Sequence, residues 1–515
     1  MAPVGPVGSV APNQKPDDRP QPFLQCFQWP LSAQRAQWPQ TQSPTTLHNL
    51  LAFLPFSPLE KFRLVSENMN EEKRATFGGR ISAVLVAAGS AVGLGNIWRF
   101  PYLAGENGGG AFLVIYLAAV LLIGLPLMLS EFSLGTATKR NAVGAFRQLD
   151  KRWVPLGYMG VLSSVLILGF YLVVAGWTAE YMIHSLFSDQ VQNTDPQSHV
   201  EAFNNFISNP WKPVLYALLF SVATHLIITR GVQRGIERAS KVMMPLLFLA
   251  LAVLAVNAIL MPGGMAGLRF FLAPDFSKVT AETFLMAVGQ AFFSLSIGLG
   301  TMITYASYFK KGTSVRGTAL QVTLLDTVVA VLAGLVIFPT VFSAGLEPGS
   351  GPSLVFITLP SIFCKMPMSA LWSTIFFLLL VLAALTSTIS MHESATAYLE
   401  EEWKMTRRKA AWCVTIFTGL LGIVASLSLG IWKAHTLFGL TFFDLLDYLT
   451  ANIMLPLGAL LTCVFIGWKV DRKLFEQQLY PDCRSGFAFR LVRFLVRYVC
   501  PVLLVVLFAD NIGLM

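Results

Sequence analysis

The sequence predicts an all-α membrane protein with eleven transmembrane helices. Only 13% of the 515 residues are charged, whereas soluble domains average about 25%. Hydrophobic residues make up 54%, and the mean hydropathy is +0.61. So few charges cannot cover the surface of a water-soluble chain, so most of this one must face lipid. Basic residues also cluster in every other connection between the apolar runs, as expected of a multi-pass protein.

Each of the eleven runs reaches about the 20 residues that a helix needs to cross a bilayer. The basic connections place the N-terminus in the cytoplasm and, with an odd number of spans, the C-terminus outside. These loops also explain the net charge of +9, so no nucleic-acid partner is expected. The predicted spans are 80–104, 110–136, 154–187, 212–229, 239–261, 280–309, 317–342, 368–399, 409–430, 441–469 and 487–513.

The first 68 residues differ from the rest. They hold 11 of the 28 prolines and eight glutamines, and no apolar period lasts long enough to bury a core. Residues 1–68 are therefore predicted to be a disordered tail, which either binds a partner or lies upstream of a true start at Met69. The transmembrane domain would then be residues 69–515.

Two of the predicted spans are interrupted by small residues, at 89–96 and 294–300. Glycine weakens a helix by about 1 kcal/mol relative to alanine, although either run alone fits close helix packing. The runs occupy matching positions in two five-span halves, 80–261 and 280–469, with 487–513 as an extra helix. This five-plus-five pattern predicts an inverted repeat with broken helices 1 and 6. Unwound turns offer N–H groups to an anion and carbonyl oxygens to a cation, which suggests a zwitterion bound beside a cation.

The segment Ala91–Tyr102 (AVGLGNIWRFPY) and the following Glu106–Phe112 (ENGGGAF) resemble the signature of the neurotransmitter:sodium symporter family, and in particular its bacterial amino-acid transporters. Three further stretches support this resemblance, at Pro126–Glu131, Gly235–Arg238 and Thr304–Tyr308. The resemblance implies a leucine-transporter-like fold in the cell (inner) membrane. It also implies symport of sodium with a neutral, hydrophobic or aromatic amino acid by alternating access. It leaves open whether the chain forms a homo-oligomer.

The resemblance further implies two sodium sites. One would be built from the carbonyls of Gly89, Val92 and Ala383 and the hydroxyls of Thr386 and Ser387. The other would use the carboxylate of the substrate and groups of Ala91, Asn96, Ser294 and Asp326. A substrate that is also a sodium ligand would make the binding of each depend on the other.

Asp326 is the most informative single residue, because an ionised carboxylate inside a span costs about 2.5–3.5 kcal/mol. It is either a charged sodium ligand or a protonated structural residue. Chloride-dependent members of the family carry Asn at this position and Ser four residues later, where this chain has Asp326 and Ala330. We therefore expect chloride not to be required, although Tyr116, Gln290 and Ser294 match the rest of the chloride site.

The resemblance also identifies a predicted substrate site, in which the Tyr171 hydroxyl meets the carboxylate of the amino acid. Gly93 stands where members that carry monoamines have an acidic residue, which favours a substrate with its own carboxylate. The predicted substrate-binding residues are Ser90, Ala91, Leu94, Gly95, Ile167, Tyr171, Phe293, Ser294, Ser296, Leu299, Ser387 and Met391.

Two charge pairs match the gates of the family, Arg99 with Asp447 outside and Arg74 with Glu401 inside. The alternative interpretation is that all four are ordinary charges at the membrane interface, since exposed ion pairs contribute only about 0–1 kcal/mol to stability. No protease, hydrolase or phosphate-binding motif occurs, so neither an enzyme nor an ATP-driven pump is expected. A proton-coupled transporter with the same fold and a non-transporting amino-acid sensor remain alternatives.

Overall fold

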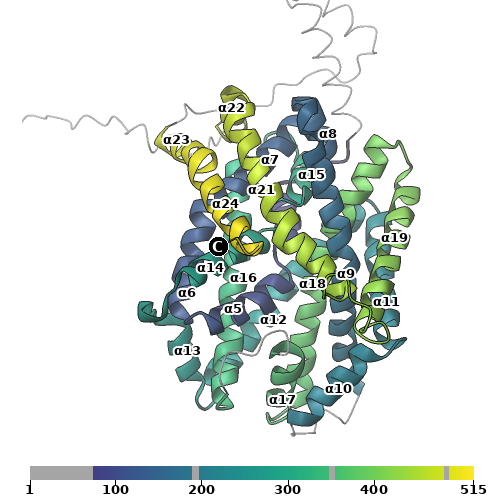
Figure 1. Ribbon diagram of the computed structural model, residues 1–515, viewed down its shortest axis with the longest axis vertical. Helices are drawn as coiled ribbons and strands as arrows, with labels where there is room; N and C mark the ends of the chain where they lie inside the picture. Colours follow the sequence, from purple (N-terminus) through teal and green to yellow (C-terminus); the bar gives the residue numbers. More distant parts are fainter. Residues whose placement is uncertain (1–73, 188–195, 347–353, 481–485, 515) are drawn as a thin grey trace, which may run out of the picture. The chain divides into compact units, whose positions relative to one another are not determined.

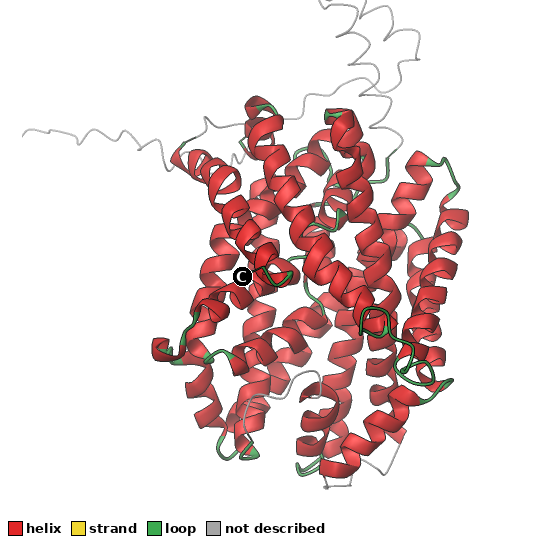
Figure 2. Cartoon of the chain, viewed as in Figure 1, coloured by secondary structure: helices red, strands yellow, loops and turns green. Residues whose placement is uncertain are grey.

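The computed structural model describes residues 74–187, 196–346, 354–480 and 486–514. All of them belong to one compact unit, Glu71–Pro481 with Ser485–Met515. The predictions made for residues 1–68 lie outside the described residues. Within the described part, every regular element is a helix and none is a strand, as Figure 2 shows.

The first half of the unit contains the first broken helix and the four predicted spans after it (Figure 1). The α-helices are interrupted or extended by short π- or 3-10 turns, labelled η. In chain order the elements are α4 (Arg80–Ala91), η1 (Gly95–Arg99), α5 (Phe100–Glu106), α6 (Gly110–Ala119), η2 (Val120–Gly124), α7 (Leu125–Thr138), α8 (Ala142–Leu149), η3 (Lys151–Trp153), α9 (Val154–Phe187), α10 (Pro196–Ser208), α11 (Lys212–Thr229), η5 (Val232–Glu237), α12 (Arg238–Leu260) and α13 (Gly264–Leu272).

The second half begins with the other broken helix. Its elements are η6 (Phe276–Lys278), α14 (Ala281–Ser294), α15 (Thr301–Ser307), α16 (Val315–Ser343), η7 (Leu354–Thr358), α17 (Leu359–Phe363), α18 (Ser369–Glu402), α19 (Arg407–Ser428), α20 (Phe442–Asp447), η8 (Tyr448–Met454), α21 (Leu455–Val464), η9 (Phe465–Lys469), α22 (Arg472–Leu479), α23 (Phe487–Phe494), η10 (Leu495–Val499) and α24 (Cys500–Asn511).

The described helices agree with the predicted spans in place, but the count of eleven stays a prediction. Nine helices in the described ranges are long and apolar enough to cross a membrane. The bent pair Arg80–Ala91 and Gly95–Glu106 makes a tenth if it is counted as one span. The predicted span 280–309 consists of two shorter helices, α14 and α15, because the backbone leaves the helical path between them.

The outward faces of the helices are apolar, which fits a lipid environment. On α12, Val242, Leu249 and Val256 recur every seven residues and are 63%, 60% and 59% exposed. In water such a stripe would cost free energy, whereas lipid chains solvate it.

The interior holds the long helices that position the site. α9 packs against α18, α11 and α19, while α16 packs against α12, α13 and α4 (Figure 1). Side-chain caps define the start of several helices. The Ser314 hydroxyl accepts the Gly317 N–H at the start of α16, and Thr280 and Thr283 form a capping box at the start of α14.

Candidate functional site

The break in helix 1 lies where the glycine-rich run predicts it. α4 ends at Ala91, Val92 is extended, and the helix pair on either side bends by 55°. Gly93 N–H leaves the helical ladder and donates to Asn96 Oδ1 at 3.2 Å. A Cβ atom on Gly93 would lie 2.5 Å from Ser387 Oγ, so only glycine fits beside α18 here.

The break in helix 6 spans the residues between α14 and α15. Ser296, Gly298 and Gly300 all have positive φ, at 53°, 86° and 69°. The Ser296 hydroxyl donates to the Ser90 carbonyl at 2.9 Å, which joins the two breaks directly. Two runs that are about 200 residues apart in sequence therefore form one unwound region, as expected of an inverted repeat.

A carboxylate cluster lies beside this region and consists of Asn96, Ser294 and Asp326. Asn96 Nδ2 donates to Asp326 Oδ1 at 2.7 Å and to Ser294 Oγ at 2.9 Å, and the Ser294 hydroxyl donates to Asp326 Oδ2. None of the three side chains is more than 1% exposed. No basic side chain of the described residues forms an ion pair with Asp326, so the buried carboxylate lacks a positive partner. Oxygen ligands around an unpaired carboxylate fit a hard cation such as sodium.

A hydroxyl cluster lies on the other side of the same break and consists of the Val92 carbonyl, Thr386 and Ser387. Both hydroxyl oxygens are 3.4 Å from Val92 O, and Thr386 also donates to Ala383 O at 2.9 Å. Gly89 faces the Thr386 side chain, which its Cβ would meet at 3.4 Å. Four of the predicted ligands are thus linked by close contacts, with Gly89 beside them. All their oxygens are neutral, which suits a monovalent cation.

The predicted substrate residues surround the unwound region. The Tyr171 hydroxyl on α9 accepts the Leu94 N–H at 3.2 Å. Gly95 faces the Phe293 ring, because a Cβ atom at Gly95 would lie 2.9 Å from that ring. Ile167, Leu299 and Met391 are all buried, and Ser90 Oγ is buried with no hydrogen-bond partner in the described part of the chain. The site therefore combines freed backbone groups with an apolar wall and has no acidic side chain among the predicted wall residues.

Ala91 is the predicted ligand with the least support from contacts. It is the last residue of α4 and is 4% exposed. Within the described ranges, no side chain donates a hydrogen bond to its carbonyl. The roles of all these residues stay predictions.

The inner charge pair is formed. Arg74 forms an ion pair with Glu401 and contacts the Ser307 hydroxyl, and its guanidinium lies 4.7 Å from the centre of the Tyr308 ring. Phe77 is 1% exposed and packs edge-on against Tyr308, with ring centroids 5.8 Å apart. These contacts join the segment before α4 to α15 and α18.

The outer charge pair is not formed. Arg99 instead lies over the Phe293 ring, 4.6 Å from its centre. Arg99 and Asp447 are both described, and no ion pair joins them. The two predicted charge pairs therefore differ, because the inner one is formed and the outer one is not.

Two buried acidic residues, Glu393 and Glu131, were not predicted from the sequence. Glu393 on α18 is 0% exposed, accepts the Tyr308 hydroxyl at 2.8 Å and forms an ion pair with Arg407 at 2.5 Å. Glu131 on α7 accepts the Gly298 N–H at 2.7 Å and so holds the break in helix 6. Both lie inside predicted spans, where any carboxylate is a signal of function, so the sequence alone could have singled them out.

The fold and the site define a sodium-dependent membrane transporter, not an enzyme, and comparisons with known proteins agree. The chain belongs to the sodium:neurotransmitter symporter family, whose model matches residues 74–200 and 197–515. The predicted family and the all-α, leucine-transporter-like fold are thereby confirmed.

Three similar proteins place the chain within this family. It is 38% identical over 450 residues to YhdH of Bacillus subtilis, an uncharacterized sodium-dependent transporter, which covers 87% of this chain and 100% of the relative. An uncharacterized sodium-dependent transporter of Haemophilus influenzae is also 38% identical, over 456 residues covering 86% of this chain and 99% of the relative. The crystal structure of MhsT in complex with L-phenylalanine matches with a TM-score of 0.79 and 39% identity, over 85% of this chain and 100% of that one.

Proposed function

We propose that this protein imports a neutral, hydrophobic or aromatic amino acid together with sodium by alternating access. One observation carries the proposal: the carboxylate cluster, the hydroxyl cluster and the Tyr171 hydroxyl all adjoin one unwound region. Such a region can bind both charges of a zwitterion and a cation beside it.

The coupling between sodium and substrate follows from shared contacts. The backbone at Leu94 and the Tyr171 hydroxyl can donate to the carboxylate of an amino acid, because they already lie 3.2 Å apart. Asn96 follows two residues after Leu94, so the same carboxylate can complete the shell of a sodium ion in the carboxylate cluster. Each ligand then strengthens the binding of the other by the same factor.

The side chains that line the site support the proposed class of substrate. The buried side chains of Ile167, Leu299 and Met391 in this wall are apolar, and Gly93 supplies no acidic group that would pair with an amine. MhsT was crystallised with L-phenylalanine, which supports an apolar or aromatic substrate here.

We further propose two sodium sites, one in each cluster, and no requirement for chloride. The negative charge of Asp326 would balance the sodium ion in the carboxylate cluster, where other members use chloride. We also infer that the protein resides in the cell (inner) membrane. The basic connections support a cytoplasmic N-terminus and an external C-terminus.

Uptake of radiolabelled leucine, phenylalanine and tryptophan into proteoliposomes tests the proposal. We expect accumulation with an inward sodium gradient, none without it, and little change when gluconate replaces chloride. Binding without accumulation would indicate a sensor. Accumulation driven only by a proton gradient would overturn the sodium assignment.

A further inference from the structure

Three arginines form a stripe on the last helix, at the end of the bundle where Figure 1 shows α22 and α23. The basic connections assign this end to the cytoplasm. Arg490, Arg493 and Arg497, here called the arginine stripe, are spaced by three and four residues, so they share one face of the helix. Arg497 is the eleventh residue of the membrane span Phe487–Asn511. The stripe therefore reaches from the connection into the span.

The arginine stripe lacks acidic partners. None of its three residues forms an ion pair within 4.0 Å with a carboxylate of the described chain. Arg472 and Arg497 repel the guanidinium of Arg493, which Asp471 attracts. The Nε atom of Arg497 is buried, and no group in the described ranges accepts a hydrogen bond from it. A buried N–H without an acceptor costs free energy, which a bound anion would recover.

Two aromatic rings flank the guanidinium of Arg497. It lies 5.5 Å from the centre of the Trp468 ring and 5.4 Å from that of Tyr498. Gly467 allows η9 and η10 to approach closely here, because a Cβ atom on it would lie 3.1 Å from Arg497 Cα. Trp468 is 44% exposed, and Trp and Tyr side chains are enriched at the headgroup level of a bilayer. We therefore expect Arg497 at the level of the lipid headgroups.

An exposed apolar stripe runs beside the arginines. It consists of Phe487, Leu491 and Phe494, which are spaced by four and three residues and are 71%, 42% and 53% exposed. Water solvates such a surface poorly, whereas acyl chains cover it at little cost. Basic and apolar residues on adjoining faces are typical of a helix that lies at the membrane interface.

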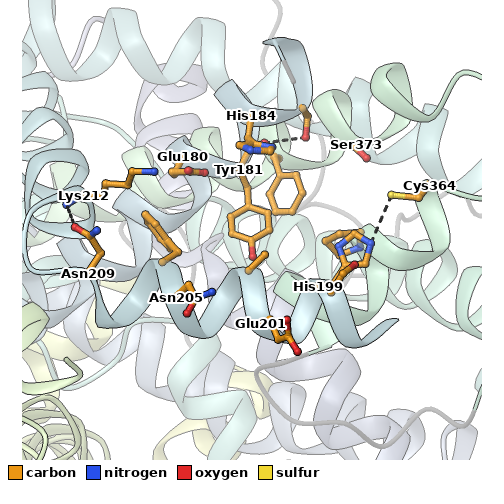
Figure 3. Close-up of a pocket in the computed structure, with 16 residues that line it drawn as sticks. Glu180, Tyr181, His184, His199, Glu201, Asn205, Asn209, Lys212, Cys364 and Ser373 are labelled. Atoms are coloured by element: carbon orange, nitrogen blue, oxygen red, sulfur yellow. Dashed lines mark hydrogen bonds between the residues drawn. The ribbon is translucent and has the colours of Figure 1, made fainter. Parts of the chain in front are cut away.

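The outer side of the protein differs in its balance of charge. A cavity of about 550 Å³, enclosed by α9, α10, α11, α17 and α18, opens on that side. Figure 3 shows Glu180 and Lys212 directed toward each other across one end of it, so charges of both signs line this cavity. The described residues from 469 to 497 instead include six basic and two acidic side chains. The inner surface therefore attracts negative charge, unlike the outer cavity.

We infer that the arginine stripe and Trp468 bind the phosphate of an anionic phospholipid in the inner leaflet. A guanidinium donates two parallel hydrogen bonds to a phosphate, and Arg497 Nε gains the acceptor that it lacks. The apolar stripe contacts the acyl chains of the same lipid. A free phosphate would satisfy the arginines and leave the apolar stripe uncovered, so the observations favour a lipid. The inference holds whichever amino acid and cation are transported.

Native mass spectrometry of the purified full-length protein, stripped of lipid in detergent, tests this inference. The probes are dioleoylphosphatidylglycerol, dioleoylphosphatidylcholine and inorganic phosphate. We expect saturable binding of phosphatidylglycerol, about tenfold tighter than binding of phosphatidylcholine, with no displacement by millimolar phosphate. Arg493→Gln/Arg497→Gln should weaken the binding of phosphatidylglycerol about 30-fold, because each basic residue near an anionic lipid adds to the attraction.

Arg230→Gln/Arg234→Gln is the matched control, because it removes two exposed basic residues from another cytoplasmic connection. It should leave the binding unchanged. Arg493→Lys/Arg497→Lys keeps the charge without the planar fork and should weaken the binding about threefold. A helical circular dichroism spectrum like that of the wild type shows that each variant is folded.

Three results would overturn the inference. Equal losses in the two glutamine double variants would show unspecific attraction to the inner face. Equal affinity for the two lipids, or displacement of phosphatidylglycerol by phosphate, would show a site for a free anion. Absence of phosphatidylglycerol binding would indicate that an acidic protein covers this surface. Sodium-driven uptake measured in parallel distinguishes these failures from failure of the proposed function.

Discussion

The carboxylate cluster and the hydroxyl cluster adjoin the same break in helix 1, yet they differ in the charge and the spacing of the ligands that they offer a cation. The carboxylate cluster contains a formal charge, and Asn96 Nδ2 lies 2.7–2.9 Å from its partners in the other two side chains. The hydroxyl cluster is neutral, and its hydroxyls lie 3.4 Å from the Val92 carbonyl. It also joins the break that follows α4 to a separate helix, α18. We therefore expect the first cluster to provide most of the attraction for sodium and the second to make binding depend on the positions of these helices.

The largest effect is expected from Asp326→Ala. Loss of the only charge in the carboxylate cluster should weaken sodium-dependent uptake by about 100-fold or more, equivalent to about 2.7 kcal/mol. Uptake measured against sodium concentration in proteoliposomes checks this. Glu282→Ala, which removes an exposed carboxylate from α14, is the control. Uptake close to wild type in Asp326→Ala would contradict the assigned role.

A bound chloride ion should be able to replace the negative charge of Asp326 when that residue is neutralised. Asp326→Asn alone should lose most uptake, and the double variant Asp326→Asn/Ala330→Ser should regain part of it only when chloride is present. Tyr116 and Gln290, which match the chloride site, flank Ser294 in this region. The measurement is uptake in chloride and in gluconate. Recovery that is equal in both anions would show that Asp326 does not replace chloride.

Smaller effects are expected in the hydroxyl cluster. Thr386→Ala and Ser387→Ala each remove one neutral oxygen, so each should raise the sodium concentration for half-maximal uptake about tenfold. Thr462→Ala is a matched control, because Thr462 is buried on α21 and, among the described residues, bonds only to the Gly458 carbonyl in its own helix. An equal shift in all three variants would indicate general loss of packing.

The smallest effect is expected at the inner gate. Arg74→Ala removes the pair with Glu401, but Asn141 Nδ2 still donates to the Glu401 carboxylate at 2.9 Å, so this carboxylate keeps a partner. Uptake should therefore fall about two- to fivefold, with sodium affinity nearly unchanged. Arg152→Ala, an exposed basic residue next to α9, should have no effect. A large change in sodium affinity in Arg74→Ala would indicate that the gate and the clusters are not separate.

Much of the fold could be predicted from sequence, because hydropathy and basic loops report directly on which segments enter lipid. The breaks at Gly93 and Gly298 were also predictable, since glycine marks strained or closely packed backbone. Two contacts were not predicted: the hydrogen bond that the Gly298 N–H donates to Glu131, and the ion pair of Glu393 with Arg407. Each joins segments that come together only on folding, and sequence spacing carries no information on such contacts. The pair of Arg74 with Glu401 was predicted and is formed. Whether Arg99 meets Asp447 could not be predicted, because it depends on the conformational state.

The most direct test is to count bound ²²Na⁺ ions per chain by equilibrium dialysis of the purified protein with saturating L-phenylalanine. We expect two ions for the wild type, one for Asp326→Ala and one for the double variant Thr386→Ala/Ser387→Ala. A count that is the same in the wild type and both variants would contradict the assignment of sodium to these two clusters.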